Sequence, residues 1–173
     1  MASPKSCAIL GHNPMRFAWG FDEEAAECHD MKMELAQQIM VLRQQGVTHF
    51  SVACDYGVGL YAAELINVLR DNDPELMLFC VTPYEEQATK WTPELRERYA
   101  YDLRQCDYQT LVQEAYTPGC MMRRNRYMVD ASRILIAAFD GRPGGTARTL
   151  EYAARRRLEI IQIPIDSAPA DEI

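Results

Sequence analysis

The residues best suited to chemistry lie in glycine-rich turns that follow apolar runs. The turn Gly141–Thr146 follows the apolar run Ile134–Phe139 and opens a helical pattern. Its adjacent glycines leave backbone amides unshielded at a helix N-terminus, where the helix dipole favours an anion. Thr146 can cap the helix or donate to a phosphate oxygen, and Arg142 or Arg148 can pair with that phosphate. An ordinary structural turn could have the same composition, but the combination favours a phosphate site at Gly144, Gly145 and Thr146.

Two earlier turns offer further candidates. The turn Gly11–Pro14 follows the apolar run Cys7–Leu10, and its glycine permits close backbone approach to a ligand. The turn Asp55–Gly59 separates a predicted strand from a predicted helix and resembles a phosphate cradle. It lacks the third glycine of a dinucleotide fingerprint and the lysine of a P-loop, and both segments also suit tight structural turns. The ligand-binding candidates here are Gly11, His12, Asn13, Asp55, Gly57 and Gly59.

A third group of candidates is cationic or aromatic. The segment Arg123–Asp130 carries three arginines within four positions, which cannot all share one face of a helix. Either the cluster is a solvated helix end, or Arg124 and Asn125 point into a ligand cleft while neighbouring side chains pack in the core. Aromatic-rich turn segments could stack on a base or serve only packing. Their residues are Pro83, Tyr84, Gln87, Trp91 and Tyr116.

Strand and helix patterns alternate along the whole chain and position these turns. Strands are predicted at Cys7–Leu10, Phe50–Cys54, Leu76–Val81, Thr110–Val112, Ile134–Phe139 and Ile160–Ile163. Helices are predicted at Glu23–Gln45, Leu60–Leu69, Met121–Ala131 and Thr146–Arg157, with two weaker helical pieces after Pro83 divided at Trp91–Pro93.

The strongest strands are apolar without alternation, which is typical of strands covered on both faces. The predicted fold is therefore α/β, a Rossmann-like three-layer sandwich with a mostly parallel sheet and helices on both faces. We predict one domain over residues 1–165 and a short flexible tail over 166–173. Ligands of such sheets bind at the carboxyl ends of the strands.

Composition excludes several classes of protein. The chain has 173 residues, 48% of them hydrophobic and 25% charged, which excludes disordered and low-complexity classes. No apolar run approaches the roughly 20 residues of a membrane span, so a cytoplasmic protein without membrane association is expected. The net charge of −7 argues against nucleic acid as a partner. The six cysteines include no CxxC pair, so neither a metal site nor a disulfide framework is expected.

Taken in chain order, these segments resemble the YpsA-like proteins of the SLOG superfamily. The resemblance rests on the turn at Gly11-His12, the string Arg124–Asp130 and the turn Gly144–Thr146, and it spans about Ile9 to Pro164. It implies a Rossmann-like fold and a nucleotide-derived or nucleic-acid ligand. Relatives include the LOG phosphoribohydrolases and the DNA-processing protein DprA. For YpsA-like proteins the resemblance implies that the ligand is a nucleotide such as an ADP-ribose derivative. It also implies a link to cell-division or stress regulation.

Two positions depart from the family pattern. The family usually has Arg where this chain has Asn13, and Asp where this chain has Gly59. If those two side chains bind ligand in the family, part of the site is lost or rewired here. The Gly-Gly-Thr turn matches without change.

Three functions follow from these observations. The leading hypothesis is a binding or sensing protein that has no resident cofactor and takes a nucleotide or ADP-ribose-like ligand. The alternative is a LOG-like nucleoside-monophosphate phosphoribohydrolase, for which the resemblance puts a catalytic carboxylate at Glu151, with Arg124 as its partner. Arg148 interrupts the LOG loop pattern and disfavours this alternative. The third is a scaffold that acts only through protein contacts, and a homodimer is expected by analogy with other open α/β domains.

Overall fold

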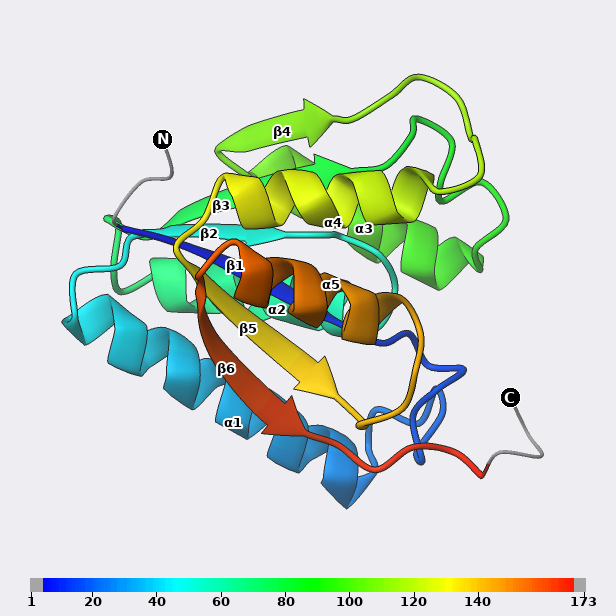
Figure 1. Cartoon of the computed structure of the whole chain (residues 1–173), viewed down its shortest axis with the longest axis horizontal. Coiled ribbons are helices and arrows are strands. Elements are labelled where there is room, and N and C mark those ends of the chain that lie inside the picture. Colours follow the sequence, from blue (N-terminus) through cyan, green and yellow to red (C-terminus); the bar gives the residue numbers. More distant parts are fainter. Residues whose placement is uncertain (1–4, 170–173) are drawn as a thin grey trace.

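The computed structural model describes residues 5–169 of the chain, in which strands and helices alternate (Figure 1). The strands are β1 (Ser6–Gly11), β2 (His49–Val52), β3 (Met77–Thr82), β4 (Tyr108–Leu111), β5 (Ile134–Phe139) and β6 (Glu159–Pro164). The helices are α1 (Ala26–Gln44), α2 (Val58–Arg70), α3 (Pro93–Gln105), α4 (Cys120–Asp130) and α5 (Gly145–Arg155).

The six strands form one sheet in the order β4-β3-β2-β1-β5-β6, and every neighbouring pair is parallel. The chain builds outward from β1 to β4 and then returns to place β5 on the other side of β1. The strand order therefore reverses between β1 and β5, where the loops after the two strands diverge and leave a crevice at the carboxyl edge.

Helices cover both faces of this sheet and confirm the predicted three-layer α/β sandwich. One core cluster packs α1, α2 and α3 against one face, and a second packs α4 and α5 against the other. Figure 1 shows α4 and α5 in front of the sheet, with α1, α2 and α3 behind it. β1 and β5 are buried along almost their whole length, which explains their unbroken apolar sequences.

Two predicted details are wrong. Only one of the two helical pieces expected after Pro83 is a helix, because residues 85–90 form successive turns. The α3 helix starts where Thr92 Oγ1 accepts a hydrogen bond from the Leu95 amide and Pro93 occupies the first helical position. In addition, the helix predicted from Glu23 begins only at Ala26, because residues 23–25 form a turn and a bend.

The segment after β6 returns to the first loop. Ala18 N–H donates to Asp166 O, Ala168 N–H donates to Arg16 O, and the Ala168 side chain is buried. Residues 170–173 of the predicted tail lie outside the described residues. Within residues 5–169, no helix is long and apolar enough to cross a membrane, and no group of three or more potential ligand side chains could hold a metal ion.

A carboxyl group is buried between α2 and α3. Asp102 is fully buried, its Oδ1 accepts a hydrogen bond from the Asn67 side chain, and its Oδ2 has no hydrogen-bond partner in the described part of the chain. Burial, with a contribution from the nearby Glu64 charge, raises the pKa of Asp102 to about 7.

This buried carboxyl predicts stability that decreases as the pH rises. Because the pKa of Asp102 is about 7 in the folded chain and ~3.9 when unfolded, the folded state holds an extra proton between these values. Its stabilising effect is complete below the unfolded pKa and is lost as the pH rises through about 7. Asp102→Asn should therefore raise the free energy of unfolding at pH 8 by about 1–3 kcal/mol, and by much less at pH 5. Urea unfolding at both pH values measures this, with the exposed Asp71→Asn as control; equal effects at both pH values would contradict the assignment.

Candidate functional site

A cavity of about 1040 Å³ opens at the carboxyl edge of the sheet, where β1 and β5 diverge. Its walls come from the turns after β1, β2 and β3, from the segment after β4, from the first two turns of α4 and from the first turn of α5. Twelve of the candidate residues predicted from the sequence line it: Gly11, His12, Asn13, Asp55, Tyr84, Gln87, Trp91, Tyr116, Arg124, Asn125, Gly145 and Thr146.

The other four candidates lie behind the cavity wall and shape it. Gly57 has a φ of +102°, and a Cβ there would lie 2.6 Å from the His12 carbonyl oxygen, so it holds two turns in close contact. A Cβ on Gly144 would lie 2.8 Å from the Arg16 guanidinium. Gly59 packs against the Asp55 carboxylate, and Pro83 is buried.

A chain of polar contacts joins the turn after β1 to the turn after β5. His12 Nε2 lies 3.2 Å from Asp140 Oδ1, and His12 Nδ1 lies 3.2 Å from Thr146 Oγ1. Burial lowers the pKa of His12 although the Asp140 carboxylate opposes this, so the ring is neutral at pH 7. The Thr146 hydroxyl is therefore held by an uncharged imidazole at the first turn of α5.

Asp140 is the centre of that chain. Its side chain is fully buried, and Arg16 donates to it from Nε at 3.0 Å and from Nη2 at 2.7 Å. Burial opposes ionisation of Asp140, but hydrogen bonds from the Arg142 amide and Arg16 outweigh it and keep its pKa below the usual value. Sequence reasoning missed Arg16 and Asp140, because neither lies in a recognisable motif and their 124-residue separation closes only in the fold.

A second buried ion pair lies across the cavity. Arg124, which is 4% exposed, has its Nη2 3.2 Å from Asp55 Oδ2 and donates hydrogen bonds to Asn125 Oδ1. Asn125 in turn donates to Thr149 on α5. Burial raises the pKa of Asp55, and the Arg124 guanidinium opposes that shift. The string containing Arg124 thus fixes α4 to the turn after β2 and to α5.

The Asp55 carboxylate occupies the space that a side chain at position 59 would need. A Cβ built on Gly59 would overlap Asp55 Oδ1 and lie 3.0 Å from the Cys54 amide nitrogen. In this turn the carboxylate therefore comes from position 55, four residues before Gly59.

Aromatic side chains form the outer part of the cavity. Tyr56 and Trp91 meet edge to face with ring centroids 5.1 Å apart, and Tyr84 meets Tyr116 in the same way at 5.5 Å. All four line the cavity. Beside them, Gln87 is buried, and its amide group makes no hydrogen bond within residues 5–169. These side chains offer faces and edges on which a planar ring can stack.

Three other residues singled out in the sequence lie elsewhere. Glu151 is exposed on α5 and does not line the cavity. Arg142 donates a hydrogen bond to the Ala168 carbonyl, 3.0 Å away, and so holds the segment after β6. Arg148 is exposed on the outer side of α5.

Comparison with protein families gives one match over nearly the whole chain. The family model YpsA, described as the YspA SLOG family, matches residues 7–171. A UPF0398 protein of Halalkalibacterium halodurans is 31% identical over 130 residues, which cover 73% of this chain and 69% of that protein. A UPF0398 protein of Bacillus cereus is 26% identical over 159 residues, covering 90% and 85% respectively.

Two solved structures share the fold. DNA processing protein A from Helicobacter pylori, studied for its single-stranded DNA binding mode, superposes with a TM-score of 0.63 at 14% identity, covering 98% of this chain and 71% of that one. DNA processing protein A (DprA) from Streptococcus pneumoniae gives a TM-score of 0.59 at 12% identity, covering 92% and 51%. At these identities the likeness concerns the fold alone.

The packing of Asp55 against Gly59 predicts a non-additive pair of substitutions. Gly59→Ala should destabilise the protein by about 1–3 kcal/mol, because the new methyl group overlaps the Asp55 carboxylate. Asp55→Ala should also destabilise, because it leaves the Arg124 guanidinium buried without its ion-pair partner. In the double variant the overlap is gone, so its loss should be smaller than the sum of the two.

Denaturant unfolding of the three variants measures this coupling. Gly145→Ala is the control, because a Cβ at Gly145 meets no atom within 4 Å; its stability should stay within ~0.5 kcal/mol of the wild type. Additive losses in the double variant would contradict the packing described here.

Proposed function

The chain belongs to the YspA SLOG family, and from this premise and the site geometry we propose that its cavity binds a nucleotide-derived ligand. The observation that carries the proposal is that an open helix N-terminus and a set of aromatic side chains line one cavity. A nucleotide needs both, because its phosphate and its base are recognised by different chemistry.

The phosphate end of the site is the first turn of α5. Gly145 is exposed, lines the cavity and has open space where a side chain would be, so its amide is accessible to an anion. Thr146 lies beside it with its hydroxyl held by His12. Arg16 also lines the cavity, where its charge is paired with the Asp140 carboxylate. This arrangement favours phosphate over a neutral ligand.

The base end of the site is the aromatic region. Tyr56, Tyr84, Trp91 and Tyr116 supply stacking surfaces, and the unpartnered amide of Gln87 supplies a donor and an acceptor for a base edge. A volume of about 1040 Å³ lies at the upper end of the usual range for ligand pockets, ~300–1000 Å³. It therefore suits a nucleoside joined through a diphosphate to a second sugar, such as an ADP-ribose derivative, better than a nucleoside monophosphate.

A sensing role fits this cavity better than hydrolysis. A glycosidic hydrolase needs a carboxyl group within about 3 Å of the group that it activates. Glu151, the residue that the LOG resemblance implies, is exposed outside the cavity. Two other carboxyl groups do line the cavity: that of Asp55 is held by the buried Arg124, and that of Glu86 lies in the exposed turns after β3. The neighbour from Helicobacter pylori, named for binding single-stranded DNA, fits the same ligand chemistry, since a strand end also presents phosphate and bases.

The phosphate site predicts opposite outcomes for two substitutions of equal size. A panel of AMP, ADP-ribose and inorganic phosphate should include at least one compound that raises the thermal midpoint of the wild type. A ligand at 100 times its dissociation constant adds about 2.7 kcal/mol, a shift of several degrees for a chain of this size. Gly145→Asp should abolish the shift by putting a carboxylate where the phosphate binds, whereas Gly145→Asn should keep most of it.

The open space at Gly145 allows both variants to fold, and their midpoints without ligand check this. If no nucleotide stabilises the wild type, or if both variants respond like the wild type, the proposed site is wrong.

The choice between sensing and hydrolysis predicts no free base from nucleoside monophosphates. Incubation of the wild type with AMP or CMP, followed by chromatography, should show no multiple turnover. Asp55→Asn and Glu151→Gln are the variants to compare. Steady base release that Asp55→Asn eliminates would establish a hydrolase using the cavity carboxylate, and release that Glu151→Gln eliminates would restore the LOG-like mechanism.

A further inference from the structure

Positive charge is concentrated in one part of this acidic chain. Residues 120–158 contain nine arginines, no lysine and three acidic residues, a formal net charge of +6. The rest of the chain carries nine basic and twenty-two acidic residues, a formal net charge of −13. The net charge describes the whole chain, whereas the affinity for a polyanion depends on local charge, so this separation leaves one part of the surface suited to a polyanion.

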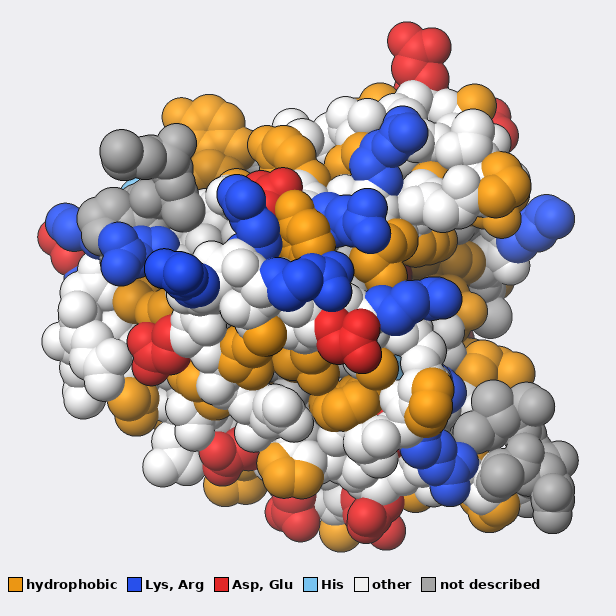
Figure 2. All heavy atoms as spheres, viewed as in Figure 1, with side chains coloured by type: hydrophobic (Ala, Val, Ile, Leu, Met, Phe, Trp, Pro, Cys, Tyr) orange, Lys and Arg blue, Asp and Glu red, His pale blue; other side chains and the backbone are white. Residues whose placement is uncertain are grey.

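The charge of this span lies on one face of the molecule. Residues 120–158 form α4, β5 and α5, and β5 is buried between the two helix layers. Figure 2 shows a band of Lys and Arg side chains across the face over α4 and α5. We call this surface the α4–α5 face; its exposed arginines are Arg123, Arg126, Arg133, Arg148, Arg155, Arg156 and Arg157.

Most of these arginines have no carboxylate partner. Arg156 Nε lies 3.0 Å from Asp130 Oδ1, and within residues 5–169 the other six exposed arginines form no ion pair. Elsewhere in the molecule, Lys32, Arg43, Arg70 and Arg98 each contact a carboxylate. Uncompensated like charges on adjacent helices repel one another, and a polyanion lying on the face would relieve that repulsion.

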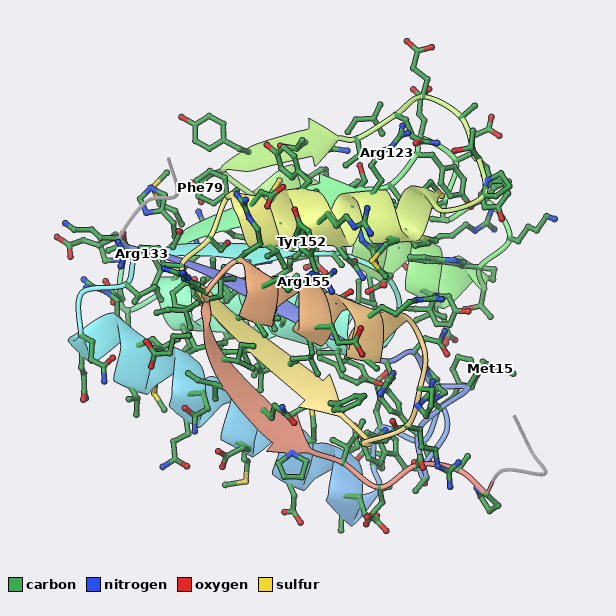
Figure 3. The ribbon with its side chains drawn as sticks, viewed as in Figure 1. Met15, Phe79, Arg123, Arg133, Tyr152 and Arg155 are labelled. Carbon is green, nitrogen blue, oxygen red and sulfur yellow. The ribbon has the colours of Figure 1, made fainter. Side chains whose placement is uncertain are left out.

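Aromatic rings are placed among these charges. Two guanidinium groups lie over the Tyr152 ring, with Arg126 Cζ 5.3 Å and Arg155 Cζ 5.9 Å from its centroid. In Figure 3, Arg123 and Arg133 lie toward opposite ends of α4, and Tyr152 and Arg155 lie on α5 between them. On α4, Tyr127 is 45% exposed. Arginine and tyrosine faces both stack on nucleic-acid bases, and arginine pairs with phosphate.

From this arrangement we propose that the α4–α5 face binds single-stranded nucleic acid. The arginines contact successive phosphates, and bases stack on Tyr127 and on the group formed by Arg126, Tyr152 and Arg155. A single strand is favoured over a duplex because its base faces are free to stack on exposed rings. This surface is separate from the cavity and does not depend on the cavity binding a nucleotide.

The test is fluorescence anisotropy of a labelled 20-nucleotide oligo-dT strand with the full chain. The wild type should bind at 50 mM salt, with a slope of log K against log salt of about −2 to −3.5, as expected for three to five phosphate contacts. The double variant Arg126→Glu/Arg155→Glu should weaken binding at least tenfold.

The matched control is Arg96→Glu/Arg104→Glu on α3. It changes the net charge equally, both residues are exposed, and Arg104 lies over Tyr101 with its Cζ 6.0 Å from the ring centroid. This control should change affinity less than threefold. Tyr127→Ala should weaken single-strand binding about fivefold and leave binding to a duplex of the same length unchanged. Thermal midpoints show that each variant is folded.

Three results would overturn the proposal. The first is no binding by the wild type at 50 mM salt. The second is an equal loss in the two charge-reversal pairs, which would make the effect one of net charge and not of this face. The third is a duplex bound as tightly as the single strand with no effect of Tyr127→Ala, which would assign the face to duplex phosphates.

Discussion

The buried carboxylate of Asp140 is the interaction on which the functional edge of this protein depends. It lies immediately after β5, and it takes hydrogen bonds from Arg16 and the Arg142 amide, while His12 Nε2 lies 3.2 Å from its Oδ1. A charge with no solvent exposure is tolerated only when such partners surround it. Because two of these partners come from the loop after β1, the carboxylate holds together the two loops that diverge at the switch in strand order. His12 extends the same chain of contacts to Thr146 at the start of α5.

Close packing at two glycines also holds the neighbouring turns in place. A Cβ at Gly11 would lie 2.5 Å from Val58 Cγ2, and one at Gly57 would lie 2.6 Å from the His12 carbonyl oxygen. These two glycines bring the turns after β1 and β2 into van der Waals contact. Gly145 differs because it faces open space in the cavity. These glycines thus have two different roles. Gly11 and Gly57 allow turns to pack closely, whereas Gly145 leaves its backbone amide accessible.

The pairing of charged side chains differs between the two faces of the sheet. On the helices behind the sheet, α1, α2 and α3, several basic side chains are paired with acids, such as Arg98 with Glu23 and Glu64. The helices in front, α4 and α5, carry arginines that remain largely unpaired (Figure 2). The N-terminal halves of these two front helices also contribute Asn125 and Gly145 to the cavity wall. One layer of the sandwich therefore borders both candidate binding surfaces, and the other serves mainly to close the core.

The sequence alone determined the fold class and most of the cavity wall, because both follow from local patterns. Unbroken apolar runs require strands covered on both faces, and turns that follow parallel strands must meet at one edge. Only the tertiary structure decided which glycines have open space before them, because Gly57, Gly59 and Gly144 are used in packing while Gly145 is not. It also decided the partners of Asp140 and the exposed position of Glu151, since both depend on how loops far apart in the chain approach one another. The local sequence pattern of a segment indicates whether it forms a helix or a strand. Which distant residues contact one another depends on the folded arrangement of the whole chain, which no single segment determines.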